Sequence, residues 1–186
     1  MMANGSAGAR RRGAGFTVHE LLIAVCIAGA VALSSAGLWR IGQETVLTTA
    51  ANELVAHLAL ARSEAIKRSV AVRMCPSADG AECLASGGDY TFWQRGWLVY
   101  ADADANGRPG AAEILRLHAG AGDRVVIRTS RSRPAVSYQP VGTAGGSTIT
   151  FAVCDARDPQ RARYVTISNT GRARVSRTTT SSVRCR

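Results

Sequence analysis

The longest hydrophobic stretch begins abruptly at Phe16 and continues to Leu38, after fifteen small, polar and basic residues. As a helix it would extend for about 34 Å, which is enough to cross a bilayer. Arg10–Arg12 precede it and Arg40 follows it. Basic residues before a span favour retention of that end in the cytoplasm. The pattern predicts one transmembrane helix over residues 16–38.

Apolar residues then recur at helical spacing between Gln43 and Arg68. The repeating positions are Leu47, Leu54, Leu58, Ala61 and Ala65. Most charged residues of this segment lie off the apolar stripe, so one face of the helix is suited to packing. We therefore expect residues 39–69 to continue the helix as an amphipathic half that packs on a globular head.

After Ser69 the periodicity becomes that of short strands separated by turns. The expected strands are Val70–Met74, Tyr90–Trp93, Gly96–Tyr100, Glu113–His118, Arg124–Arg128, Ser147–Val153, Arg163–Ser168 and Arg172–Ser176. A long N-terminal helix packed on antiparallel strands is an α+β fold. Residues 70–186 are expected to form the β-rich head.

Charge is distributed unevenly along the chain, which has a formal net charge of +10. Residues 1–15 contribute +3, residues 16–123 contribute −3, and residues 124–186 contribute +10. Arginine-rich codon usage would explain why Lys67 is the only lysine, but it would not explain this asymmetry. A basic C-terminal third favours a polyanionic partner.

Of the five cysteines, one lies in the apolar run and four lie in the expected head. Cys26 lies in the apolar run and is expected to be a lone packed thiol. The even set in the head favours disulfides, and four cysteines allow three pairings. We favour Cys75–Cys83, which closes a short loop, and Cys154–Cys185, which ties down the tail. Their spacing is not that of a zinc site.

The apolar run contains one acid, Glu20, and a carboxylate inside a membrane needs a partner or a function. The segment from Gly15 to Leu22 (GFTVHELL) resembles the prepilin processing motif of type IV pilins and type II secretion pseudopilins. The resemblance implies a leader over residues 1–15, cleavage between Gly15 and Phe16 by a prepilin peptidase, and methylation of Phe16. It also implies that Glu20 pairs with the amino terminus of a neighbouring subunit. The alternative is a plain signal anchor that contains a glutamate.

Segments of the head extend this resemblance. Gly96–Asp102, Glu113–Arg116 and Ile167–Arg174 are similar to the FimT/GspH branch of pilin-like proteins. This implies two β-sheets against the helix, filament partners, and a single-pass inner-membrane protein with a periplasmic head. Two hypotheses follow: a minor pilin of a type IV pilus, or a GspH-like minor pseudopilin of a type II secretion system.

Gly171-Arg172-Ala173-Arg174 resembles the GRxR motif of FimT-like minor pilins that bind DNA during natural transformation. In a strand, Arg172 and Arg174 point to one face, about 7 Å apart, and guanidinium groups bind phosphate in a bidentate way. Further candidates are Arg161, Arg163, Arg177, Arg184, Arg186 and the hydroxyl run Thr178–Ser182. We expect salt-dependent contacts to the backbone of duplex DNA without sequence preference. The alternative is a solvated strand face with a basic tail.

A second motif suggests a cation. Asp102, Asp104, Asn106 and Glu113 match the spacing of a Ca²⁺ loop, and their oxygens suit a hard ion. The flanking segments read as strands rather than helices, so the alternative is a hairpin loop rich in turn formers. A Ca²⁺-binding anchored head is the third hypothesis. No catalytic constellation stands out, so we expect neither an enzyme nor any other cofactor.

Overall fold

The computed structural model describes residues 17–145 and 148–185, without the side chains of residues 33–44. The leader, Gly15, Phe16 and Arg186 therefore lie outside the described residues. The chain divides into two compact units, Met1–Gly42 and Gln43–Arg186. One helix, α1 (Val18–Arg68), contributes to both.

In the first unit, α1 begins with a reciprocal capping box. The Glu20 amide donates to Thr17 Oγ1 at 3.3 Å, and the Thr17 amide donates to Glu20 Oε2 at 3.5 Å. The side chains of residues 17–32 are exposed. Cys26 is a free, exposed thiol, so our expectation that it is packed was wrong for the isolated chain, because no described residue covers this segment. No helix in the described part of the chain is sufficiently long and apolar to span a bilayer.

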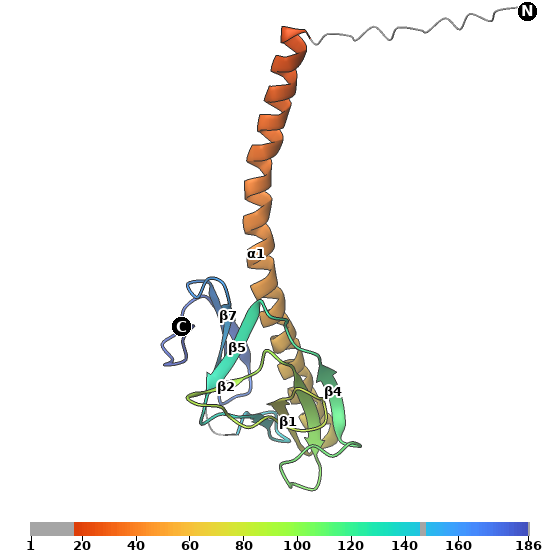
Figure 1. Cartoon of the computed structure of the whole chain (residues 1–186). Helices are drawn as coiled ribbons and strands as arrows, with labels where there is room; N and C mark the ends of the chain where they lie inside the picture. Colours follow the sequence, from red (N-terminus) through yellow and green to blue (C-terminus); the bar gives the residue numbers. More distant parts are fainter. Residues whose placement is uncertain (1–16, 146–147, 186) are drawn as a thin grey trace, which may run out of the picture. The chain divides into compact units, whose positions relative to one another are not determined.

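The second unit contains two antiparallel sheets (Figure 1). The four-stranded sheet has the order β4 (Ile114–His118), β3 (Trp97–Asp102), β1 (Ala71–Pro76), β6 (Val136–Tyr138). The five-stranded sheet has the order β2 (Tyr90–Phe92), β5 (Val125–Ser130), β7 (Ile149–Asp155), β8 (Ala162–Ile167), β9 (Ala173–Ser176). The predicted α+β class is confirmed, and each predicted strand lies within two residues of its expected place. Only β6 among the described strands was missed, because three residues between prolines carry too short a pattern.

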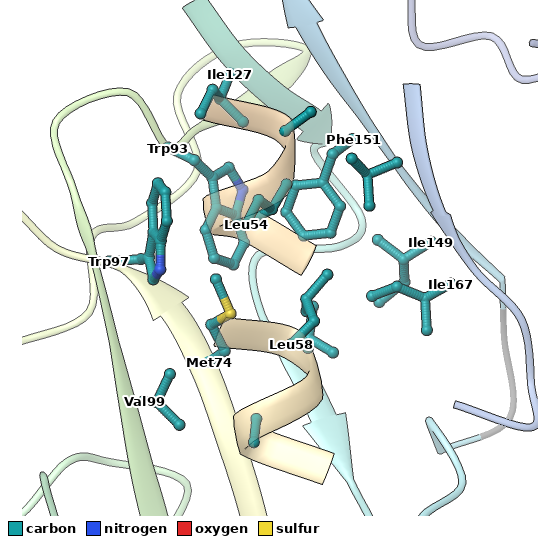
Figure 2. Packing of buried hydrophobic residues seen from close by; sticks show 14 of the residues in the cluster. Leu54, Leu58, Met74, Trp93, Trp97, Val99, Ile127, Ile149, Phe151 and Ile167 are labelled. Atoms are coloured by element: carbon teal, nitrogen blue, oxygen red, sulfur yellow. The ribbon is translucent and has the colours of Figure 1, made fainter. Parts of the chain in front are cut away.

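The predicted apolar stripe of α1 forms the centre of the core (Figure 2). Leu54 and Leu58 are fully buried together with residues of both sheets, including Val99 and Phe151. Trp93 meets Phe151 edge to face at 5.0 Å between ring centres. The amphipathic helix is therefore stabilised by tertiary burial on two sides, as is usual for helices in proteins.

Two histidines lie where the second half of α1 meets the four-stranded sheet. His57 Nδ1 accepts a hydrogen bond from Trp97 Nε1 at 3.2 Å, and the His118 ring stacks on Trp97 at 3.9 Å. Burial lowers the pKa of both histidines, and the positive charge of Arg116 lowers it further. Glu53 opposes this effect; its Oε2 lies 3.6 Å from His118 Nε2. Both shifts favour the neutral imidazoles over the charged ones.

Both favoured disulfides are present. Cys75 is bonded to Cys83, and Cys154 is bonded to Cys185. The second bond fastens the C-terminal tail to β7, and the tail runs beside that strand in Figure 1. The tail is therefore part of the folded head.

Candidate nucleic-acid interface

The predicted basic site lies on the face of the five-stranded sheet that points away from the core. Thr150 of β7 pairs with Thr166 of β8, which in turn pairs with Arg174 of β9. The alternating residues Phe151 and Val165 point to the other face, where they are fully buried in the core. Since side chains alternate along a strand, Arg174 belongs to the outer face, where it is exposed.

A tight turn between β8 and β9 presents Arg172 on the same face. The Gly171 amide donates to Ser168 O at 2.8 Å, and the Ser168 amide donates to Arg172 O at 3.1 Å. Arg172 is exposed and two residues from Arg174, so the two guanidinium groups emerge about 7 Å apart along the chain.

Gly171 is buried, and the structure shows what it does within the turn. Its φ of +80° belongs to the left-handed region, and a Cβ there would run into Gly142 O, closer than real Cβ contacts come. The residue is glycine because the turn packs directly against the loop that follows β6.

That loop is held by residues that the sequence analysis did not single out. Arg62 of α1 donates from Nε to Gly142 O at 2.9 Å. A Cβ on Gly171 would also meet the ring of Tyr138, whose pKa burial raises to about 12. No local pattern links Arg62, Tyr138, Gly142 and Gly171, because they are far apart in the chain and are joined only by the fold.

The remaining candidate arginines are not all brought to this face. Arg161 pairs with Asp158 at 3.2 Å. Arg163 lies two residues before the core residue Val165 and therefore on the same face of β8. Its guanidinium donates to Ala162 O at 3.0 Å. The period of two along β8 thus puts Arg163 on the face opposite to that of Arg174. Arg161 precedes β8, and its guanidinium lies beside Asp158. Arg177 and Arg184 are exposed in the C-terminal tail that follows β9.

The electrostatic surroundings leave the motif arginines without a local counter-charge. Among the described residues, no carboxylate pairs with the guanidinium of Arg172 or Arg174. The two acids of the last third are engaged otherwise. Asp158 pairs with Arg161, and buried Asp155 accepts the Arg157 amide at 2.9 Å. Two neighbouring exposed cations are suited to an anionic ligand.

The tail covers a neighbouring part of the same outer face. Val183 is buried against Ala152 and Tyr164, and Cys185 packs beside them. Thr179–Ser182 of the predicted hydroxyl run Thr178–Ser182 thus lie beside Thr150 and Thr166 of the sheet rather than in a free tail. The structure brings them to the sheet face that carries Arg174.

The candidate calcium loop is closed by its own hydrogen bonds. Asp102 accepts the Gly107 amide at 2.9 Å and lies 3.5 Å from Arg73 Nε. The Glu113 carboxylate accepts the amides of Ala103 and Gly110 at 3.0 Å each. Within the described residues, no three His, Cys, Asp or Glu side chains gather as a metal site would require. The loop connects β3 to β4 as a hairpin, and calcium binding by Asp102, Asp104, Asn106 and Glu113 stays a prediction.

Comparison with known proteins places this geometry in context. The family model described as type II transport protein GspH matches residues 50–171. The type IV minor pilin FimU of Pseudomonas aeruginosa strain PAO1 is similar in structure, with a TM-score of 0.55 and 25% identity over 70% of this chain and 87% of FimU. A second crystal form of FimU gives a TM-score of 0.53 at 25% identity, over 69% of this chain and 91% of FimU. No curated protein matches the sequence.

Proposed function

This chain belongs to the GspH family of pilin-like proteins, and from that premise we propose that it is a minor pilin of a type IV pilus that captures extracellular DNA for uptake. Family and fold are those of structural subunits of filaments, either type IV pili or type II secretion systems. Membership implies association with other pilins. The DNA-binding role goes beyond the family and is argued from Arg172 and Arg174.

Assembly is proposed to follow the route that the N-terminal motif implies. A prepilin peptidase would cleave between Gly15 and Phe16, Phe16 would be methylated, and Glu20 would pair with the amino terminus of a neighbouring subunit. The exposed apolar side chains of α1 support this proposal, since a large exposed apolar surface marks a protein or membrane contact. They include Val18, Leu21, Leu22, Val25 and Ile27. We propose that residues 16–38 anchor the precursor in the inner membrane with the head in the periplasm.

The observation that carries the DNA proposal is the pair of unopposed guanidinium groups on one exposed strand face. Arg174 projects from β9, and Arg172 is held next to it by a buried glycine turn. Because the turn packs against the loop at Gly142, the backbone that carries Arg172 is held in place before a ligand arrives. Guanidinium groups at this spacing suit successive phosphates of a nucleic-acid backbone, which carry no sequence information.

The test is binding of fluorescent duplex DNA by the full-length chain in non-ionic detergent, followed by anisotropy at several salt concentrations. We expect affinity to fall steeply with salt, because bound phosphates release counterions. Replacing Arg172→Gln together with Arg174→Gln should weaken binding at least tenfold and reduce the slope of log K against log salt by about 2.

A matched control removes the same charge from another surface. Arg95 and Arg108 are exposed in loops outside the five-stranded sheet, so Arg95→Gln with Arg108→Gln should leave the slope nearly unchanged. Equal losses in the two double variants would show that net charge alone drives binding. Absence of binding at low salt would refute the proposal.

The second candidate is a GspH-like pseudopilin of a type II secretion system, which the description of the matching family favours. Such a subunit requires the same helix and head but no nucleic-acid surface. The DNA titration therefore separates the two candidates directly. A chain that binds no DNA would be assigned to the secretion filament.

A further inference from the structure

A polar pocket lies next to the motif arginines on the outer face of the five-stranded sheet. It has a volume of about 320 Å³, within the range of small-ligand sites. The sheet contributes Ser130, Ile149, Thr150 and Thr166, and the tail contributes residues 179–183. Thr166 is the cross-strand partner of Arg174, so the pocket and the arginine surface are continuous.

We propose that this pocket binds a phosphate group of the DNA that Arg172 and Arg174 hold. The proposal rests on the proposed function for the identity of the ligand. Among the described residues that line it, none is acidic or aromatic, and Arg133 adds a guanidinium. An arginine is a donor without an acceptor, so this lining is suited to a ligand rich in acceptors.

The hydrogen bonds already made inside the pocket leave hydroxyl protons available. Thr179 Oγ1 accepts the Ser181 amide at 3.0 Å, and Ser181 Oγ accepts the Val183 amide at 3.3 Å. A hydroxyl oxygen that accepts from an amide keeps its own proton for another partner. Thr150 and Thr166 share one hydrogen bond at 3.3 Å, which uses one of their two protons. The pocket therefore presents several O–H donors and a guanidinium, the donor set that an oxyanion requires.

A neutral sugar fits this lining less well than phosphate does. A sugar presents its own hydroxyl protons, which need acceptors, and its apolar face favours an aromatic platform, while the described lining offers neither a carboxylate nor a ring. The ionised oxygens of phosphate carry no proton, so they only accept hydrogen bonds. The hydroxyl oxygens of the lining could accept from either ligand, so the preference for phosphate comes from the Arg133 guanidinium and from the absence of carboxylates and rings among the described lining residues.

The pocket depends on the Cys154–Cys185 disulfide. That bond and buried Val183 hold the tail against β7 and β8, and the tail supplies five of the lining residues, including Val183 itself. Arg172 and Arg174 belong to the β8–β9 hairpin and do not require it. Loss of the disulfide is therefore expected to remove the pocket and leave the arginine pair in place.

The test uses full-length chain in detergent with labelled threonine methyl groups, observed by NMR during titration with inorganic phosphate. We expect saturable shifts at Thr150, Thr166, Thr179 and Thr180 that chloride at equal ionic strength does not produce. They should persist in Arg172→Gln/Arg174→Gln and weaken at least threefold in Thr150→Val/Thr166→Val, which keeps the side-chain shape. They should be lost in Cys154→Ser/Cys185→Ser and kept in the control Cys75→Ser/Cys83→Ser.

Absence of saturable shifts in the natural chain would overturn the pocket whether or not DNA binds. The DNA arm then examines the ligand: Thr150→Val/Thr166→Val should weaken duplex binding three- to tenfold, with an unchanged melting temperature showing that the head is intact. Phosphate binding with unaltered DNA affinity in that variant would overturn the assignment to DNA. Phosphate binding in a chain that binds no DNA at all would refute both that assignment and the proposed function, while the failure of phosphate alone would leave the Arg172–Arg174 proposal standing.

Discussion

Replacing Gly171 with alanine tests how the β8–β9 turn is built. Gly171 adopts a φ of +80°, and a Cβ would collide with the backbone oxygen of Gly142. The left-handed conformation costs about 1–2 kcal/mol for a residue with a Cβ. The collision is with backbone that Arg62 holds at 2.9 Å, so relief requires a shift of the loop, at a cost of about 1–3 kcal/mol. We expect Gly171→Ala to lower the free energy of unfolding by about 2–5 kcal/mol.

The two contributions are separated by a control at Gly122. Its φ is +71°, and nothing lies within 4 Å of a Cβ built there. Gly122→Ala should therefore show the conformational cost alone, about 1–2 kcal/mol. The assay is urea unfolding of the full-length chain in detergent, followed by tryptophan fluorescence, because Trp93 and Trp97 are fully buried.

The same pair of variants links stability to binding. A displaced turn would move Arg172, so Gly171→Ala should also weaken DNA binding several-fold, whereas Gly122→Ala should not. Equal destabilisation by the two substitutions would refute the close approach of the turn to Gly142. Normal DNA binding by a folded Gly171→Ala variant would show that the glycine does not position Arg172.

Two further predictions concern the histidines beside Trp97 and the processing of the N-terminus. Burial lowers the pKa of His57 and His118, so the unfolded chain takes up protons first as the pH falls, and the stability of the head should decline below its unfolded histidine pKa of about 6.5. His118→Gln should flatten this decline in urea titrations from pH 7.5 to 5, and an unchanged slope would contradict the role of this ring. At the N-terminus, mass spectrometry of protein from native cells should show a chain that begins with methylated Phe16. An intact leader through Gly15 would refute processing.

Much of the head could be predicted because its pattern is local. Leu54 and Leu58 repeat at helical spacing, and β7 and β8 alternate, so helix, strands and core faces followed from the period of burial. The strand β6 carries only three residues, which is too few to establish a period. It forms because it pairs with β1, a partner far away in the chain.

The motif arginines illustrate the same division. Alternation alone put Arg172 and Arg174 on one face. The period of two also puts Arg163 and Val165 on the same face of β8. Only the structure showed that this face is the one covered by the core. The Cys154–Cys185 disulfide was favoured from spacing, whereas the pocket beneath the tail required the position of Val183.

The order of residues by itself determined the long helix, the strands other than β6 and the separation of two arginines along the chain, because each depends on short-range periodicity or on a motif, and it favoured the disulfide partners without fixing them. The tertiary structure decided which arginines share a surface, why Gly171 has no side chain, and where hydroxyl groups of the tail meet those of the sheet. These depend on contacts between residues that are far apart in the chain, and no local pattern encodes such contacts.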